Sequence, residues 1–157
     1  MKSIKIHTDG GCRGNQHKFN IGGIGIVTRA FLNNDMVGST EYYQGFKNTT
    51  NNQMELQAAI KALELCETHI SNGVGVELFT DSAYVVNGIN QWVDGWIKRG
   101  WKKADKKPVE NKELWQRLVD LSSGKNVLII KTKGHANDEW NNRADALANI
   151  AMDKLEG

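Results

Sequence analysis

The order of hydrophobic periods along the chain is the feature that most limits its fold. Three strand-like segments come first, and their short connections favour an antiparallel meander; they are residues 3–9, 22–28 and 41–46. From Asn52 the period becomes helical, and later strand-like segments alternate with helical ones. Strands first, followed by alternating helix and strand, are typical of an α/β sheet of mixed direction.

The later elements complete a predicted five-stranded mixed sheet. Strands are predicted at 74–80 and 126–132, and their strand–helix–strand connections indicate that both run parallel to the first strand. Helices are predicted to flank the sheet at residues 52–71, 82–88, 92–98, 112–121 and 140–155. The 157 residues contain no linker, repeat or low-complexity tract, so we expect a single domain over 1–157.

Four acidic residues fall at informative places in this pattern. Asp9 and Asp81 each end a strand. Glu55 lies early in the first helix, and Asp145 lies in the last one. Ligands gather at the carboxyl ends of parallel strands, so Asp9 and Asp81 should lie close together if their strands are neighbours. Taken singly, each residue has an ordinary alternative: an aspartate after a strand is often a turn former or a helix cap, which suits Asp81-Ser82.

Together, the four carboxylates would suit a pair of hard divalent cations. Several carboxylates in a small space repel one another unless a cation neutralises them. Mg²⁺ or Mn²⁺ takes oxygen ligands and keeps water for a phosphate substrate, and two such ions can drive a phosphoryl displacement. Zinc is a poorer candidate, because the four histidines lack metal-ligand spacing with one another.

His135 lies in a glycine-containing loop ten residues before Asp145. It could lean over the metal site and shuttle a proton near neutral pH, or it could be an ordinary exposed loop histidine. Asn141 lies one turn before Asp145 on the same face of the last helix, which directs it toward the same site.

Positive charge is concentrated in one segment. The whole chain has a net charge of only +2, but residues 98–107 hold six cationic side chains against the single carboxylate of Asp105. Trp92, Trp96 and Trp101 are interleaved with this basic segment. Indoles four residues apart on a helix can pack into the core; alternating with lysine and arginine, they also form a platform for a sugar-phosphate backbone.

The sequence does not predict a membrane or secreted protein. No apolar stretch approaches the roughly 20 residues of a membrane span, and the N-terminus passes directly into a strand without a signal-peptide core. Cys12 and Cys66 lack the spacing of a zinc or redox pair, and no disulfide is expected between them. We expect a cytosolic monomer.

Several motifs, in their order and spacing, resemble those of type 1 ribonucleases H, most closely the bacterial form with a basic protrusion. The motifs are Thr8-Asp9-Gly10, Thr49-Thr50-Asn51-Asn52-Gln53-Met54-Glu55-Leu56, Thr80-Asp81-Ser82, Trp101-Lys102-Lys103-Ala104-Asp105-Lys106-Lys107-Pro108-Val109, and Gly134-His135-Ala136 followed by Asp145. The resemblance covers nearly the whole length. It implies a ribonuclease H-like fold and an endoribonuclease that cuts the RNA strand of RNA–DNA hybrids with little sequence specificity. It also implies a two-metal-ion mechanism that leaves 5′-phosphate and 3′-hydroxyl ends.

The resemblance also implies a role for individual residues. Two Mg²⁺ ions, with Mn²⁺ as a substitute, would be bound by Asp9, Glu55, Asp81 and Asp145, and His135 would be the proton shuttle that helps product leave. Minor-groove contacts, including 2′-hydroxyls, would come from Cys12, Asn15, Asn51 and Asn52. The DNA strand would be held by Thr50 at a phosphate and by a channel of Tyr84, Trp92 and Trp96. Additional affinity for the duplex would come from Lys98, Arg99, Lys102, Lys103, Lys106 and Lys107.

The chain departs from the family pattern at three places. Gln16-His17-Lys18-Phe19-Asn20 replaces a compact Pro/Gly loop, Ala83 stands where many members carry a longer side chain, and Asn141 stands where some carry a glutamate. Two other functions remain as alternatives: a non-catalytic duplex-binding module, and a strand-transferring nuclease such as a transposase or integrase. The complete set of carboxylates disfavours the first alternative, and the short single-domain chain disfavours the second.

Overall fold

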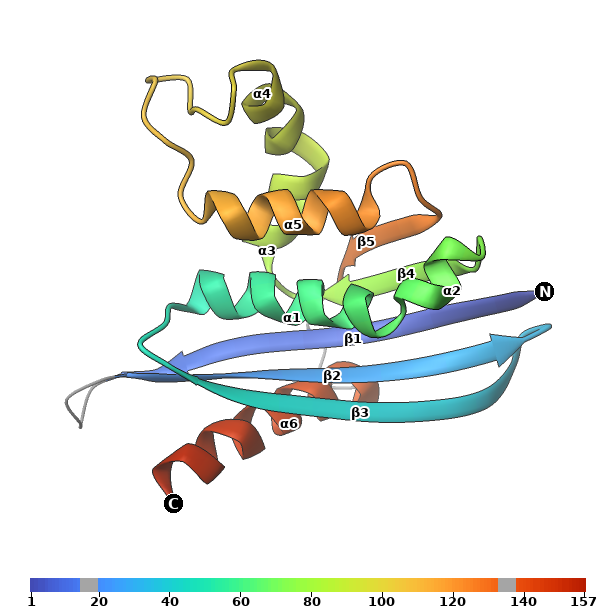
Figure 1. Cartoon of the computed structure of the whole chain (residues 1–157). Coiled ribbons are helices and arrows are strands. Elements are labelled where there is room, and N and C mark those ends of the chain that lie inside the picture. The colour runs from blue at the N-terminus through green and yellow to red at the C-terminus, as the bar shows by residue number, and fades with distance from the viewer. Residues whose placement is uncertain (15–19, 133–137) are drawn as a thin grey trace.

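The sheet has the predicted mixed direction (Figure 1). The computed structural model describes residues 1–14, 20–132 and 138–157. The strands are ordered β3-β2-β1-β4-β5, with bounds β1 (Lys2–Arg13), β2 (Ile21–Leu32), β3 (Asp35–Lys47), β4 (Gly75–Thr80) and β5 (Val127–Lys131). β2 pairs antiparallel with β1 and β3, whereas β4 runs parallel to both β1 and β5. The predicted meander and the two parallel additions are confirmed.

The first strand is longer than predicted. We expected residues 10–20 to form a turn-rich loop, but the antiparallel ladder with β2 continues to Arg13. Gly10 stays in the strand because α1 (Asn51–Leu65) lies against its backbone, where a Cβ would stand 2.4 Å from the carbonyl carbon of Met54. This glycine therefore marks a close approach of a helix and not a turn.

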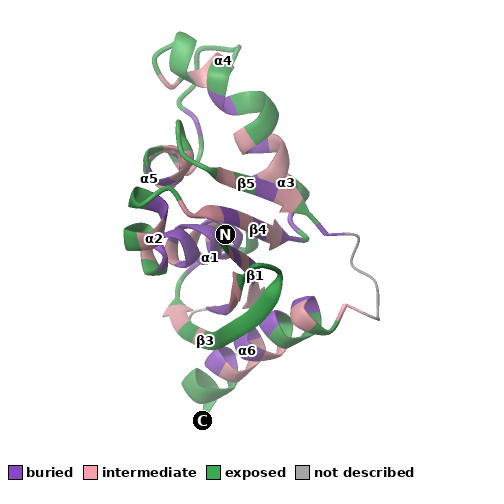
Figure 2. Ribbon diagram, turned by 90° about the vertical axis from the view of Figure 1, so that its right-hand side faces the viewer, coloured by how far each residue is buried: buried purple, intermediate pink, exposed green. Residues whose placement is uncertain are grey.

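Helices cover both faces of the sheet. α1, α2 (Glu67–Ser71) and α5 (Lys112–Ser122) lie on one face, and α6 (Glu139–Glu156) lies on the other (Figure 1). Figure 2 shows buried residues on α1 and the strands near it, whereas β3 is largely exposed. The predicted helix 52–71 is in fact two helices, because the chain tightens at Cys66, whose N–H bonds to the Leu63 carbonyl. Within the described residues, no helix has the length and apolar character needed to cross a bilayer.

Residues 83–98 form one bent helical run where we predicted two separate helices. The run consists of α3 (Ala83–Asn87), η1 (Gly88–Trp92) and α4 (Val93–Lys98). Its middle piece is a π-helical turn in place of the predicted break. Gly88 allows this turn to lie on the Trp115 ring, because a Cβ there would stand 1.9 Å from Trp115 Cη2. The run leads from the carboxyl end of β4 to the basic segment.

Two glycines of β2 let α6 pack directly on the sheet. A Cβ on Gly25 would lie 2.1 Å from the carbonyl oxygen of Ala144, and one on Gly23 would lie 2.4 Å from that of Ala148. The backbone of α6 therefore rests on the strand backbone at these two points. Asp145 lies on α6, so this contact sets how far Asp145 stands from the sheet.

Candidate active site

Three of the predicted carboxylates meet at one end of the central strands. Ligand oxygens of Asp9, Glu55 and Asp81 all lie within 4.8 Å of one another. The parallel register of β1 and β4 pairs Thr8 with Thr80, so the two aspartates that follow them come out side by side. Asp9 lies inside β1 and not at its end, because the strand continues beyond it. The prediction that neighbouring strands bring these aspartates together is nevertheless confirmed.

Asp145 reaches the same cleft from α6. Its carboxyl group lies close enough to that of Asp9 to help raise the pKa of Asp9, and it lines the cleft together with the other three carboxylates. The cleft has a volume of about 540 Å³ and lies between the ends of β1 and β4, the starts of α1 and α3, and one face of α6. Asn141, by contrast, is 8% exposed and is not among the described residues that line the cleft.

Glu55 is held in place by the start of its helix and by a strand backbone. Thr50 caps α1, accepting a hydrogen bond from the Gln53 N–H at 3.1 Å. Glu55 follows in the second turn, where the backbone N–H of Gly10 donates to its Oε1. Only 9% of Glu55 is exposed, so little water can solvate its charge. The Gly10 N–H on β1 is therefore one partner of this buried carboxylate.

Ser82, and not Asp81, caps the helix that follows β4. The Ser82 Oγ accepts a hydrogen bond from the Val85 N–H at 3.1 Å, and the Ser82 N–H donates to Thr80 Oγ1 at 3.1 Å. These bonds satisfy the turn without using the Asp81 carboxylate. The capping alternative for Asp81 is therefore wrong, and its carboxylate is available to the cluster.

Burial and mutual repulsion raise the pKa of two carboxyl groups in the cluster. The pKa of Glu55 rises to about 9, first because the group is buried and then because Asp9 and Asp81 lie nearby. The pKa of Asp9 also lies well above its usual range, because of burial, the nearby carboxyl group of Asp145 and the charge of Asp81. A set of oxygen ligands that repel one another this strongly fits a hard divalent cation, which would neutralise the cluster without a bound proton.

Mg²⁺ is expected to stabilise the fold, most strongly at high pH. The folded-state pKa of Glu55 lies above its ordinary value of 4.5, so in EDTA the free energy of unfolding should fall as pH rises from there toward about 9. At 100 times its Kd, Mg²⁺ should add about 2.7 kcal/mol, which raises the Tm by roughly 5–10 °C for a chain of this size. Thermal unfolding at several pH values, with Mg²⁺ or EDTA, measures both effects.

Two variants test whether the cluster is the origin of this stabilisation. Asp9→Asn should lose most of the rise in Tm that Mg²⁺ produces. Asp35→Asn, which changes an exposed aspartate at the β2–β3 turn, should keep it. An equal rise in both variants would mean that the cation binds elsewhere.

Part of the predicted substrate surface lines the cleft beside the carboxylates. Cys12, Asn51, Asn52 and Tyr84 are all lining residues. Cys12 lies on β1 and not in the first loop, because the strand is longer than predicted. Thr50, at the start of α1, is exposed. The predictions for Asn15 in the substrate surface and for His135 as proton shuttle fall outside the described residues.

The predicted aromatic channel is a continuous wall formed by Tyr84, Trp92 and Trp96. The ring centroids of Tyr84 and Trp92 are 6.0 Å apart, and those of Trp92 and Trp96 are 5.9 Å apart. Trp115 is fully buried behind this aromatic wall, 5.2 Å from Tyr84. Trp92, at the front, is 37% exposed. Of the two tryptophans expected on one helix face, Trp96 is half-buried against the core and Trp92 presents its indole to solvent.

The basic segment, residues 98–107, begins at the end of α4 and continues into the loop that follows it (Figure 1). Its backbone is ordered by hydrogen bonds from the Trp101 N–H to the Trp96 carbonyl at 2.6 Å and from the Lys103 N–H to the Lys107 carbonyl at 2.8 Å. Lys103 is half-buried, and the other five predicted cationic residues are exposed: Lys98, Arg99, Lys102, Lys106 and Lys107. The segment presents a structured patch of positive charge apart from the carboxylates.

Sequence reasoning missed the residues that hold the cleft together. Gly10 was assigned to a turn, although a glycine directly after Asp9 was a visible sign of close backbone contact. Arg13 ties β1 to α6 through a hydrogen bond to Asp153 at 2.8 Å. Gln53 and Asn111 join α1 to α5 through their side-chain amides at 3.3 Å, over a separation of 58 residues that leaves no local sequence signal.

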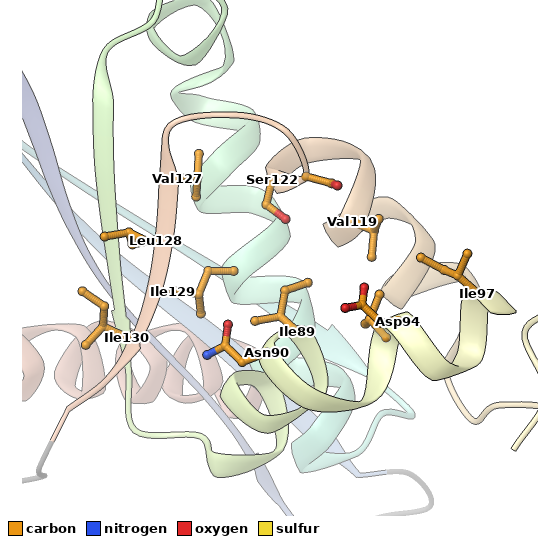
Figure 3. A pocket seen from close by; sticks show the side chains of 12 residues that line it. Ile89, Asn90, Asp94, Ile97, Val119, Ser122, Val127, Leu128, Ile129 and Ile130 are labelled. Atoms are coloured by element: carbon orange, nitrogen blue, oxygen red, sulfur yellow. The ribbon is translucent and has the colours of Figure 1, made fainter. Parts of the chain in front are cut away.

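A second cavity lies beside β5 at the edge of the sheet and has no cluster of ionisable side chains like that of the cleft among the described residues that line it (Figure 3). It has a volume of about 340 Å³ and is lined mainly by aliphatic side chains, such as Ile89, Val119 and Ile129. Among the described residues that line it, Asp94 alone is ionisable. This cavity therefore offers neither an acid–base pair nor a set of metal ligands.

Known proteins resemble this chain over nearly its whole length. The RNase H family matches residues 1–153, a range that contains the four carboxylates. The chain is 48% identical over 158 residues to ribonuclease H of Clostridium botulinum, with 99% of each chain covered. It resembles the crystal structure of LC9-RNase H1, a type 1 RNase H with the type 2 active-site motif, with a TM-score of 0.81 and 32% identity over 96% of this chain and 72% of that one. It also resembles LC11-RNase H1 in complex with an RNA/DNA hybrid, with a TM-score of 0.63 and 26% identity over 99% of this chain and 100% of that one.

Proposed function

Because the chain belongs to the ribonuclease H family, we propose that it is a metal-dependent endonuclease that hydrolyses the RNA strand of RNA–DNA hybrids. The products would carry 5′-phosphate and 3′-hydroxyl ends, and cleavage would depend little on sequence. The observation that carries the proposal is the cleft in which Asp9, Glu55, Asp81 and Asp145 converge from β1, α1, the end of β4 and α6. We expect the enzyme to act as a monomer in the cytosol.

The carboxylates would hold two Mg²⁺ ions, for which Mn²⁺ could substitute. When bound, such a pair activates a water and stabilises the leaving oxygen of an in-line phosphoryl displacement. The chain itself fixes the ligands: Gly10 holds Glu55 by a hydrogen bond, and the register of β1 with β4 sets Asp9 beside Asp81. His135, whose position lies outside the described residues, would carry a proton and help product leave.

Hybrid recognition would depend on groove shape and strand chemistry. Cys12, Asn51 and Asn52 line the cleft beside the carboxylates, where contacts to 2′-hydroxyls would distinguish RNA from DNA. Asn15 would extend this minor-groove surface. The similar LC11-RNase H1 has been solved with an RNA/DNA hybrid, which supports the same substrate for this chain. Ala83 also lines the cleft, so this chain would offer the substrate only a methyl group at that position.

The DNA strand would run along the aromatic wall toward the basic segment. An aromatic ring can pack against any base, and phosphate contacts carry no sequence information. This surface therefore suits an enzyme with little sequence specificity. Thr50 would hold a DNA-strand phosphate at the start of α1, where its exposed position permits such a contact.

Removing exposed cations from the basic segment should weaken hybrid binding and reduce its dependence on salt. Each lost phosphate contact should make the negative slope of log K against log salt shallower by about 0.9. The double variant Lys106→Ala/Lys107→Ala should therefore make it shallower by up to roughly 2. Fluorescence anisotropy with a labelled hybrid over a NaCl series measures this change. A control with Lys2→Ala and Lys154→Ala, which removes two exposed lysines elsewhere, should keep the original slope. An equal change of slope in this control would contradict a special role of the basic segment.

The ends of the products test the proposed reaction. RNA annealed to DNA is incubated with the enzyme and Mg²⁺, and the fragments are compared with markers of known termini. Fragments with 5′-phosphate and 3′-hydroxyl ends are expected. Fragments with 3′-phosphate or cyclic phosphate ends would contradict the two-metal mechanism, and binding without any fragments would favour the duplex-binding module.

A further inference from the structure

A chain of side-chain hydrogen bonds, the polar bridge, crosses from one wall of the cleft to the other. Thr49 Oγ1 donates to Gln53 Oε1 at 3.1 Å, and Gln53 Nε2 donates to Asn111 Oδ1 at 3.3 Å. Asn111 Nδ2 then donates to the Tyr84 hydroxyl at 3.1 Å, which also accepts from Trp115 Nε1 at 3.1 Å. The bridge thus links the start of α1 to the aromatic wall by way of the loop before α5.

The bridge fixes the polarity of the Tyr84 hydroxyl. Indole N–H can only donate, so the Trp115 bond makes the tyrosine oxygen an acceptor, and the Asn111 amide fills its second acceptor position. The hydroxyl oxygen is thus held by two donors. Because Tyr84 also lines the cleft, these bonds fix the place of a residue of the proposed substrate surface.

The side chain of Asn111 takes part in the bridge instead of capping its own helix. Asn111 occupies the N-cap position of α5, yet its side chain makes no capping bond. Its backbone is left-handed, with a φ of 55°, which is uncommon for a residue other than glycine. The side chain of an N-cap asparagine normally accepts a bond from its own helix. Here that side chain is committed to Gln53 and Tyr84 instead.

The other end of the bridge reaches the opposite wall. The amide of Asn20 holds the backbone of Thr49 from both sides, accepting from its N–H at 2.9 Å and donating to its carbonyl at 2.7 Å. Cys12, which lines the cleft, also contacts the Thr49 carbonyl through its thiol at 3.5 Å. Gln53 therefore sits between the wall that carries Cys12 and the wall that carries Tyr84.

We propose that Gln53 is a positioning residue that couples the two walls of the cleft and thereby sets affinity for the nucleic-acid duplex. The inference rests on the proposed function. Among the described residues, Gln53 belongs neither to the carboxylate cluster nor to the lining of the cleft. It would therefore act through Asn111 and Tyr84. Its loss should affect binding and leave the chemical step intact.

Gln53→Ala is expected to raise both the KM for an RNA–DNA hybrid and the Kd measured in EDTA by about three- to tenfold, the scale of one hydrogen bond. The kcat should stay within about twofold of the original. The control is Gln44→Ala, which removes an exposed glutamine of β3 and should change none of these values. A fall in kcat with unchanged KM and Kd would overturn the proposal.

A double-mutant cycle separates this role from a general loss of stability. Tyr84→Phe removes the hydroxyl at the end of the bridge, so adding Gln53→Ala to it should have little further effect on Kd. Fully additive effects on Kd would overturn the coupling. Gln53→Met, which keeps the length of the side chain but removes both bonds, should reproduce the effect of Gln53→Ala on Kd, and an unaltered Kd would likewise contradict it. If the original chain cuts hybrids but these variants bind normally, the inference fails and the proposed function stands.

Discussion

Asp81→Asn is expected to reduce cleavage of an RNA–DNA hybrid by at least about 100-fold while hybrid binding is retained. Even residues that only support metal ligands typically cost 10–100-fold when replaced, so the loss of a ligand should cost more. Asparagine has nearly the same shape as aspartate, and Ser82 supplies the local cap, so the turn after β4 should be preserved. The measurement is the initial rate of cleavage of an end-labelled hybrid with saturating Mg²⁺.

The thermal stability of Asp81→Asn shows whether a loss of cleavage comes from the missing carboxylate or from a damaged fold. The charge of Asp81 contributes to the raised pKa values of Asp9 and Glu55, so its removal relieves repulsion in the absence of metal. In EDTA near neutral pH, the Tm of Asp81→Asn should therefore equal or exceed that of the original chain. Asp35→Asn is the matched control and should cleave normally. Near-normal cleavage by Asp81→Asn would refute the assignment of this carboxylate.

Gly25→Ala is expected to destabilise the fold by roughly 3 kcal/mol, the upper end of the usual cost of overpacking. The added Cβ would lie 2.1 Å from the Ala144 carbonyl oxygen and 2.7 Å from the Ala148 nitrogen, which are backbone atoms that cannot turn aside. The helix must therefore move away from the sheet. The corresponding fall in Tm is roughly 6–12 °C for a chain of this size, measured by thermal unfolding.

Gly38→Ala on β3 is the matched control for this prediction. It makes the same chemical change in a strand, but no heavy atom of the described residues lies within 4 Å of the added Cβ. Its Tm should stay within a few degrees of the original. Because α6 carries Asp145, Gly25→Ala should also lower the cleavage rate at temperatures where the variant is still folded. Equal Tm values for the two alanine variants would show that α6 does not rest on the Gly25 backbone.

The sheet and the carboxylate cluster could be predicted because their signals are local. Hydrophobic periods identified the strands, and the kind of connection between them indicated their relative directions. Asp9 and Asp81 could be placed together because parallel strands end at the same edge. Where this reasoning was wrong, at residues 10–13, the glycines were interpreted as a turn, although Gly10 lies within the strand and allows α1 to approach it.

The contacts between distant elements could not be predicted in this way. Gln53 and Asn111 meet only because α1 packs beside α5, and the left-handed backbone of Asn111 has no sequence signal that separates it from an ordinary cap. The tryptophans were equally ambiguous, since helical spacing alone does not show that Trp92 is exposed while Trp96 packs against the core. A π-helical turn of this kind depends on tertiary packing, here of Gly88 on Trp115, more than on local propensity.

The most direct test of the central claim is cleavage of one end-labelled RNA in three settings: paired with DNA, paired with RNA, and single-stranded. Each is incubated with Mg²⁺, Mn²⁺ or EDTA. The proposed function predicts that the RNA is cut only when paired with DNA, and only when a divalent cation is present. Cleavage in EDTA, or equal cleavage of all three substrates, would contradict the claim that the carboxylate cleft is a metal-dependent active site for RNA–DNA hybrids.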